Sequence, residues 1–331
     1  MVLKSFVTAV LPGDSLDRLR AGRNRVALFA ERYGRRQRAI NAAITVPGLQ
    51  RRTRVAGSVW GVCMARNEED IIGHSVRHML DQGLDGVIVV DNMSTDTTPA
   101  ILRGLAAQDA RIHVGSDTQA AFHQGGKTSY LSHLAWRAGA DWVVPFDADE
   151  LWFAPGMTVK EFLVGLPSAQ DMVWCDFRNV YPLPEDGRIA LDSGNAVQVD
   201  RSESSWFRIA FRSRRWVWVG EGNHALRDHP GIPVRGLHML HYSYRSLVQY
   251  SRKASQGVAA LEAAGKGKDV AVHWRGWEEL GENERESRWL GYLSGEEGST
   301  DGAFVRGDRV VLADPSVWRR WDPNGELQVR V

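Results

Sequence analysis

Three short acidic segments carry the side chains best suited to bind a metal ion and a charged substrate. They are Asn67–Asp70, Asp91–Asp96 and Asp147–Glu150, and each follows an apolar run typical of a β-strand. Since the carboxyl ends of parallel strands lie side by side, we expect the three segments to meet in one crevice. Clustered carboxylates repel one another unless a cation or hydrogen-bond donors are present. A hard divalent ion with oxygen ligands, Mg²⁺ or Mn²⁺, is the simplest partner for such a cluster.

The spacing of Asp147 and Asp149 suits a substrate that carries a diphosphate. One or two carboxylates can hold the ion while phosphate oxygens and water complete its octahedron. An Asp-x-Asp pair alone is weak evidence, because Asp also caps helices and forms turns. Here the pair ends the fourth strand of an alternating series and follows two other acidic strand ends, which favours the metal site.

An alternating pattern of strands and helices must position these segments. Strands are expected at 59–65, 86–91, 111–115 and 141–146, and helices at 68–80, 100–107 and 126–138. Three successive strand–helix units predict a parallel sheet with helices on both faces. In the second half, strands are expected at 172–178, 205–212 and 215–219, helices at 246–264 and 274–293, and a loop at 265–269.

Four segments, taken in order, resemble the family 2-type glycosyltransferases of the GT-A fold. They are Val62–Asp70, Val87–Asp96, Trp142–Glu150, and His241–Ser246 with Lys253. The chain is most similar to their bacterial Asp-x-Asp-Glu branch, which is similar to the family 92 enzymes, over about residues 57–255. The resemblance implies an α/β, Rossmann-like mixed sheet with helices on both faces. It also implies a nucleoside diphosphate sugar as donor, Mn²⁺ or Mg²⁺ as cofactor and, in most relatives, inversion at the anomeric carbon.

The first two acidic strand ends correspond to the donor site of these enzymes. The resemblance places near the nucleobase and ribose Arg66, Asn67, Glu68, Asp91 and Ser94. The carboxylate of Asp91 can accept hydrogen bonds from a base or a ribose, and the turn from Ser94 to Asp96 begins a helix whose N-terminus favours an anion. Asn67 and Ser94 are also typical capping residues, and capping does not exclude contact with a ligand.

The third acidic strand end corresponds to the metal site of these enzymes. The resemblance implies that Asp149 is the principal metal ligand and that Asp147 contacts the ribose or a metal-bound water. Glu150 is expected to support the ligands or to bind the acceptor, and is therefore a candidate catalytic carboxylate.

Basic side chains elsewhere in the chain are candidates to neutralise a diphosphate. Lys127 lies in a Gly-Lys-Thr sequence that is similar to the end of a P-loop, but position 121 is Ala where that motif requires Gly. We therefore expect Lys127 to be either a solvated residue or a phosphate contact. Arg245 and Lys253, near and in the helix predicted at 246–264, are expected to face the leaving diphosphate.

Two histidines and one glutamate complete the candidate site. His224 and His241 could each complete a metal shell or bind a diphosphate, although a histidine is more often a core or surface residue. Glu221 is flanked by two glycines that leave its surroundings open. It is our candidate for the base, against the alternative of an exposed turn. Trp206, Trp216 and Trp218 are the tryptophans expected to face an acceptor.

The basic charge is concentrated at the N-terminus. Residues 1–55 hold 12 Lys or Arg and 3 Asp or Glu, a balance of +9, and the formal charge of the whole chain is only +1. An overall charge near zero argues against a nucleic-acid partner. Helical spacing predicts a basic amphipathic helix over 14–43 with breaks near Gly22 and Gly34. A packed helix with a solvated Arg face and contact with anionic lipid both explain this charge.

We expect three parts: a basic helical extension over 1–55, a GT-A catalytic domain over 56–265, and a helical and irregular extension over 266–331. Within the domain, 56–150 should bind the nucleotide and 151–265 the acceptor, a glycan or a lipid-linked molecule. No run reaches the roughly 18 apolar residues of a membrane span, and no signal peptide is recognisable. This predicts a cytoplasmic protein, peripheral at the inner face of the membrane if the extension binds lipid.

Two other functions stay open. A noncatalytic module could bind a nucleotide sugar or a glycan on the same fold, although retention of both Asp147 and Asp149 argues against it. A GT-A-like nucleotidyltransferase would need a Gly-rich N-terminal loop, which the sequence lacks.

Overall fold

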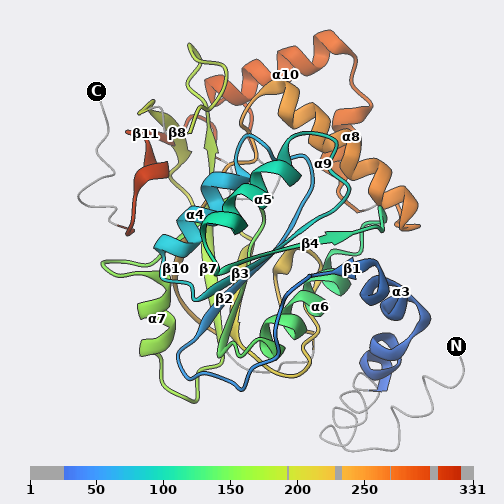
Figure 1. Cartoon of the computed structure of the whole chain (residues 1–331). Helices are drawn as coiled ribbons and strands as arrows, with labels where there is room; N and C mark the ends of the chain where they lie inside the picture. Colours follow the sequence, from blue (N-terminus) through green and yellow to red (C-terminus); the bar gives the residue numbers. More distant parts are fainter. Residues whose placement is uncertain (1–25, 192–193, 228–232, 269, 299–304, 322–331) are drawn as a thin grey trace, which may run out of the picture.

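The computed structural model describes residues 26–191, 194–227, 233–268, 270–298 and 305–321 (Figure 1). Its strands are β1 (Ile44–Thr45), β2 (Val59–Ala65), β3 (Gly86–Asp91), β4 (Ile112–Asp117), β5 (Trp142–Pro145), β6 (Glu150–Phe153), β7 (Met172–Tyr181), β8 (Val197–Asp200), β9 (Phe207–Arg212), β10 (Val234–His241) and β11 (Arg309–Leu312). They form an 11-stranded sheet in the order β1-β4-β3-β2-β5-β9-β7-β10-β6, with β8 joining β11 to β7.

The helices are α3 (Arg35–Ala43), α4 (Ile72–Asp81), α5 (Thr98–Gln108), α6 (Gln124–Arg137), α7 (Val159–Gly165), α8 (Leu247–Ala263), α9 (Val272–Glu278) and α10 (Glu282–Ser294). Short 3₁₀ turns lie at Glu221–Asn223 and Pro315–Val317. No helix in the described ranges is long and apolar enough to cross a bilayer.

Strands β4, β3, β2 and β5 are parallel, whereas β1, β9 and β6 pair antiparallel with their neighbours. The parallel sheet predicted for the first half is therefore part of a larger mixed sheet. Ala65 pairs with Asp91, and Val62 pairs with Pro145. This register places the ends of β2 and β3 side by side and brings the end of β5 next to them.

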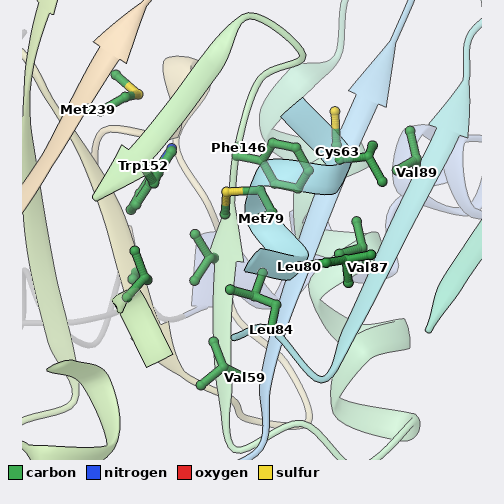
Figure 2. Close-up of a cluster of buried hydrophobic side chains, with 14 of the residues drawn as sticks. Val59, Cys63, Met79, Leu80, Leu84, Val87, Val89, Phe146, Trp152 and Met239 are labelled. Atoms are coloured by element: carbon green, nitrogen blue, oxygen red, sulfur yellow. The ribbon is translucent and has the colours of Figure 1, made fainter. Parts of the chain in front are cut away.

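The central strands are apolar on both faces because each face packs against helices. Figure 2 shows Cys63, Val87 and Val89 on one face, where Met79 of α4 packs beside Phe146. Helices α4, α5 and α7 cover this face, whereas α3 and α6 cover the other. Side chains alternate between the two faces along a strand. A run such as Gly86–Asp91 therefore contributes side chains to the hydrophobic core on each face of the sheet. The predicted strands of the first half and the helices on both faces are confirmed.

The boundaries differ from expectation in a few places. Helix α4 begins at Ile72 rather than at position 68, because the intervening residues form the loop after β2. The helix expected over 274–293 is two helices, α9 and α10, with Gly281 as the N-cap of the second. The strand expected at 215–219 is wrong, since only Val219 makes an isolated bridge, with Leu226.

The sequence did not predict β6, β8, β10 or β11. Strand β6 is only four residues long and follows directly on the acidic turn, and the other three interrupt apolar residues with His, Gly, Arg or Gln, so their periodicity is weak.

The N-terminal helix breaks at Gly34 as predicted, with residues 26–33 helical before it. The break predicted near Gly22 lies outside the described residues. Ile40 and Ile44 pack into the core beside α6, and β1 pairs with β4, so this part of the predicted extension joins the sheet. Cys63 and Cys175 are both buried and unbonded.

Candidate functional site

A cavity of about 700 Å³ lies where β2, β3 and β5 end. Its walls come from the loops after β2 and β5, the segment before α6, the turn at Glu221–Asn223, and helices α8 and α9. This is the crevice at the carboxyl ends of parallel strands that the sequence predicted. The acidic segments are brought together there, with basic side chains from the second half of the chain between them.

Asp149 lies buried in the wall of this cavity. Its Oδ2 forms an ion pair with the ammonium of Lys253, accepts a hydrogen bond from Ser243 Oγ at 3.2 Å, and lies 3.7 Å from Arg245 Nη1. Burial alone would raise the pKa of Asp149. The cations, chiefly Lys253, outweigh it and hold that pKa well below its usual range, so the carboxylate is ionised.

His241 lies next to Asp149. Its Nε2 is 3.6 Å from Asp149 Oδ2, and its Nδ1 is 3.2 Å from Asn179 Oδ1. Because an amide oxygen can only accept, Nδ1 carries a proton and donates it to Asn179, which leaves Nε2 as the ring nitrogen that faces Asp149. Ser243 Oγ, which donates to Asp149, also lies 2.8 Å from Nε2. A metal-binding histidine commonly has its other ring nitrogen held by a hydrogen-bond acceptor, as Asn179 holds Nδ1 here.

A metal site at this position would use few protein ligands. Within the described ranges, no group of three or more His, Cys, Asp or Glu side chains is arranged to hold a metal ion. Asp149 and His241 supply one carboxylate oxygen and one imidazole nitrogen on the cavity wall. Mg²⁺ is commonly held by one or two protein groups, with substrate phosphates and waters as its other ligands. The pair fits such an ion, provided that the Lys253 ammonium moves off Asp149.

Asp147 and Glu150 have different surroundings from Asp149. Asp147 lines the cavity and accepts hydrogen bonds from Gln124 at 3.2 Å and Asn223 at 3.3 Å. Glu150 is fully buried outside the cavity wall, and burial raises its pKa to about 7. Its Oε1 accepts from Arg208 Nε at 2.7 Å. Glu150 thus holds Arg208, whose Nη2 lies 3.6 Å from Asp147 Oδ2.

Arg245 ties the first acidic segment to the rest of the site. It is almost fully buried, with its guanidinium paired to Glu68 and, at 2.7 Å, to Asp70. Burial opposes its charge, but Glu68 and Asp70 together raise its pKa. Glu68 lines the cavity, whereas Arg245 lies behind it. The carboxylates expected to repel one another are therefore neutralised by Arg245, Arg208 and Lys253 of the protein itself.

Asn67, Ser94 and Asp96 link the loops that follow β2 and β3. Asn67 adopts a left-handed backbone with φ of 55°, a conformation that Asn tolerates well. Its N–H donates to Ser94 Oγ at 2.8 Å, and its Oδ1 accepts from Thr95 N at 2.7 Å. Asp96 accepts from Thr98 N at 2.9 Å at the start of α5. These side chains hold the two loops together, but neither α4 nor α5 has a side-chain N-cap, so the capping predicted for Asn67 and Ser94 is wrong.

Two buried polar atoms of the predicted donor set have no hydrogen-bond partner among the described residues, Arg66 Nε and Asp91 Oδ1. Buried groups of this kind are rarely unpaired, and one at a cavity is available to a ligand. Arg66 lines the cavity, as does Asn92, the residue after Asp91.

Lys127 is neither a solvated surface residue nor a free phosphate contact. Its side chain is buried, with Nζ 2.6 Å from Asp117 Oδ2 and 2.7 Å from the carbonyl oxygen of Gln119. Burial lowers the pKa of Lys127, and the pairing with Asp117 opposes that shift. The ion pair fastens the N-terminal turn of α6 to the end of β4, so it shapes the cavity wall.

Glu221 and His224 lie on the turn at one side of the cavity. Glu221 is half exposed, and its carboxylate accepts from Gly125 N at 3.2 Å and pairs with Lys266 Nζ at 3.0 Å. His224 Nδ1 lies 2.6 Å from the carbonyl oxygen of Phe207 and 3.3 Å from Arg208 Nη1. Burial lowers the pKa of His224 to about 4. These contacts set His224 beside Arg208 rather than beside Asp149 and His241.

Sequence reasoning missed several cavity residues. Arg208 lies within β9, and its sequence neighbours give no sign of a special role. Its place in the site depends on the ion pair with the distant Glu150. Trp274 lines the cavity as well, and among the three predicted tryptophans only Trp206 does. Trp216 instead stacks on His133 with ring centroids 4.1 Å apart.

The sequence also matches known proteins. The model of the family described as glycosyl transferase family 2 matches residues 62–179, the segment that carries all three acidic strand ends. A beta-monoglucosyldiacylglycerol synthase of Synechocystis sp. is 37% identical over 95 residues, which cover 27% of this chain and 19% of that protein. The match thus spans about a fifth of the relative's length.

Solved structures show lower similarity. S. aureus TarS (residues 1–349, in complex with UDP) has a TM-score of 0.36 and 12% identity over 72% of this chain and 71% of that chain. Glucosyl-3-phosphoglycerate synthase from Mycobacterium tuberculosis, in complex with Mn²⁺, UDP and phosphoglyceric acid, has a TM-score of 0.28 and 23% identity over 39% of this chain and 49% of that chain. The mixed α/β sheet with helices on both faces agrees with the fold class predicted from the sequence. Over residues 62–179, the chain is therefore similar to glycosyl transferase family 2.

Proposed function

We propose that this protein is a metal-dependent glycosyltransferase that moves a sugar from a nucleoside diphosphate donor to an acceptor hydroxyl, with inversion at the anomeric carbon. The observation that carries the proposal is the arrangement of Asp149, His241 and Lys253 on one cavity wall. An ionised carboxylate, an imidazole and an ammonium group meet where a diphosphate would lie. The proposal includes a place in the bacterial Asp-x-Asp-Glu branch of the family 2-type glycosyltransferases. Its support is Glu150, the Glu of that motif, which holds Arg208 beside Asp147.

The donor would lie across the ends of β2, β3 and β5. Arg66 and Asp91 offer unpaired polar atoms to the nucleoside, and Glu68 lines the same side of the cavity. Asp149 and His241 would hold Mn²⁺ or Mg²⁺. When bound, such an ion stabilises the charge that develops on a leaving diphosphate.

The chain's own residues perform the remaining steps. Lys253 is released from Asp149 and becomes a counter-ion for the diphosphate, which leaves with the electron pair of its bond to the anomeric carbon. The acceptor oxygen forms the new bond to that carbon and loses its proton to a carboxylate. Glu221 lines the cavity with an accessible carboxylate, and we assign this role to it. Glu150, buried and bonded to Arg208, is assigned to positioning instead.

The acceptor is a hydroxyl of a glycan or of a lipid-linked molecule, as in the synthesis of surface polysaccharide or glycolipid. The name of the Synechocystis relative supports a lipid product in that protein. We also propose that the protein works in the cytoplasm, at the inner face of the membrane. Residues 26–33 support this because Val26, Phe29 and Tyr33 are exposed on that helix in a strongly basic part of the chain.

Turnover separates this proposal from a binding module on the same fold. A glycosyltransferase hydrolyses its donor slowly when the acceptor is absent, and a panel of UDP- and GDP-sugars with Mn²⁺ should reveal one that releases nucleoside diphosphate. Tight binding of a nucleotide sugar without any release of nucleoside diphosphate would favour the module. Release of pyrophosphate from a nucleoside triphosphate would instead favour a nucleotidyltransferase.

A further inference from the structure

The cavity continues beyond Asp149 along one face of α8. The residues of α8 that line it are Lys253, Gln256, Gly257 and Ala260. Spacings of three and four residues place them on a single helix face. Seven residues of helix separate Lys253 from Ala260, a rise of roughly 10 Å. The cavity therefore has a charged end at Asp149 and a second end roughly 10 Å further along α8.

The second end is built mainly from apolar groups, although His123, Gln256 and His273 also line the cavity next to them. We define it as the apolar lobe, lined by 120–122, Gly257, Ala260, 270–272 and Trp274. Phe122 N donates to the carbonyl oxygen of Ala260 at 2.8 Å, which fastens the lobe's first wall to α8. The rings of Phe122 and Trp274 meet edge to face with centroids 6.2 Å apart. In Figure 1, α8 and α9 lie against each other at this side of the molecule.

Gly257 sets the position of Trp274. A Cβ atom at this position would lie only 2.3 Å from Trp274 Cε3, a contact that no real side chain makes. The absence of a side chain on α8 thus allows the indole to pack directly on the helix backbone. One side of the indole is thereby covered, and Trp274 is half-buried in the cavity wall.

The lobe suits a hydrocarbon chain better than a glycan. Val270, Val272 and Phe122 offer no hydrogen-bonding groups, and burying sugar hydroxyls without partners costs free energy. Hydrocarbon gains about 0.8 kcal/mol for each methylene removed from water. The polar end at Arg66, Glu68 and Asp149 accommodates the donor, which leaves the lobe to the acceptor side.

We propose that the apolar lobe binds the hydrocarbon part of a lipid-linked acceptor, an inference that rests on the proposed glycosyltransferase function. The chain would lie along α8 toward Phe122 and Trp274. Its hydroxyl-bearing head group would then reach the Lys253 end of the helix, where Asp149 and the donor lie.

The test measures binding of n-alkyl β-glucosides, from methyl to octyl, below their micelle concentration and in the presence of UDP and Mn²⁺. Titration calorimetry should show affinity rising by about four-fold for each added methylene. Val272→Asp should abolish this dependence, because it places a carboxylate in the lobe wall. The Val272 side chain is 63% exposed, so the change should leave the fold intact. Val248→Asp is the matched control, on α8, outside the cavity wall and 77% exposed.

A second pair of variants tests the lobe's shape. Gly257→Ala should displace Trp274 and weaken octyl glucoside binding at least ten-fold, whereas Gly276→Ala on α9, with open space around it, should change nothing. Affinity that is independent of chain length, or a chain-length dependence equal in Val272→Asp and Val248→Asp, would overturn the inference. Binding of UDP alone, measured in the same samples, tests the proposed function separately: if UDP binds and chain length has no effect, only the lipid assignment fails.

Discussion

The ammonium of Lys253 is paired with Oδ2 of Asp149, the carboxylate that the sequence predicted as a metal ligand. The two residues are 104 positions apart and come from the turn between β5 and β6 and from α8. Lys253 therefore neutralises Asp149 in the ligand-free protein, and a divalent ion must compete with it for the same oxygen. This makes Lys253 both a substitute for the ion and a counter-ion ready for a diphosphate.

Lys253→Met should separate these two roles. Mn²⁺ affinity of the nucleotide-free protein should rise by about tenfold, because a competing ion pair worth ~1.4 kcal/mol is lost. Donor turnover should fall, because the diphosphate loses a counter-ion. Titration calorimetry with Mn²⁺ and a donor-hydrolysis assay measure the two effects. Lys160→Met, which removes a surface pair with Asp85, is the control; weaker Mn²⁺ binding in Lys253→Met would refute the competition.

Glu221→Gln tests the assignment of the base. Turnover should fall by roughly 10²-fold or more, the usual scale for loss of a general base, while donor affinity stays nearly unchanged. Glu262→Gln provides a matched change on α8, where the carboxylate is 66% exposed and pairs with Arg275. Near-normal turnover in Glu221→Gln would move the role to another carboxylate, such as Asp147 on the cavity wall.

His78 makes the stability of the protein sensitive to acid. His78 is part of α4, and its ring is buried. Its Nε2 lies 2.7 Å from the carbonyl oxygen of Trp152 in β6. Burial lowers the pKa of His78 from 6.5 to about 4. Such a histidine binds a proton more readily in the unfolded chain than in the folded protein. The fold therefore loses stability as the pH falls from the pKa of the unfolded chain toward the lower pKa of the folded protein.

Between pH 7 and pH 5 the free energy of unfolding should therefore fall by roughly 2 kcal/mol from this group alone. His78→Gln keeps a hydrogen-bond donor that cannot become charged, so its stability should change less over the same interval. Urea unfolding at the two pH values measures the difference. An equal loss of stability in both proteins would show that His78 does not control it.

Phe29→Asp tests contact with the membrane. Phe29 is 62% exposed on the helix at residues 26–33, within a region whose basic residues each add about 1 kcal/mol of attraction to an anionic surface. The change should reduce sedimentation with phosphatidylserine vesicles at low salt. Val317→Asp, at an equally exposed position far along the chain, controls for the added charge. Equal sedimentation of both variants and the unchanged protein would count against membrane contact through this helix.

The sequence predicted the half of the site that local patterns determine. The runs at 59–65 and 86–91 are continuous apolar strands, so the positions of Asn67 and Asp91 at strand ends followed from the pattern. The partners of these residues did not follow, because ion pairs such as Lys127 with Asp117 depend on how distant segments meet. Trp274 was missed for the same reason: its place in the cavity depends on Gly257 of a neighbouring helix.

The structure also changes the expected effect of removing Asp149. The sequence suggested a repelling acidic cluster, in which loss of one carboxylate need not destabilise the protein. In the structure Asp149 neutralises Lys253 and lies 3.7 Å from the buried Arg245, so its loss leaves cations unpaired. Asp149→Asn, which keeps the side chain's shape, is therefore a better variant than Asp149→Ala, and its melting temperature should fall.

The most direct test of the central claim is the affinity of UDP and GDP for the full-length protein, measured by titration calorimetry with and without Mn²⁺. We predict that at least one nucleotide binds the unchanged protein more tightly with Mn²⁺. We also predict that Asp149→Asn abolishes this gain while remaining folded by circular dichroism. Asp308→Asn, which alters a surface pair with Arg201, should retain the gain. A Mn²⁺-dependent affinity that is the same in Asp149→Asn, or no binding of either nucleotide to the unchanged protein, would contradict the account.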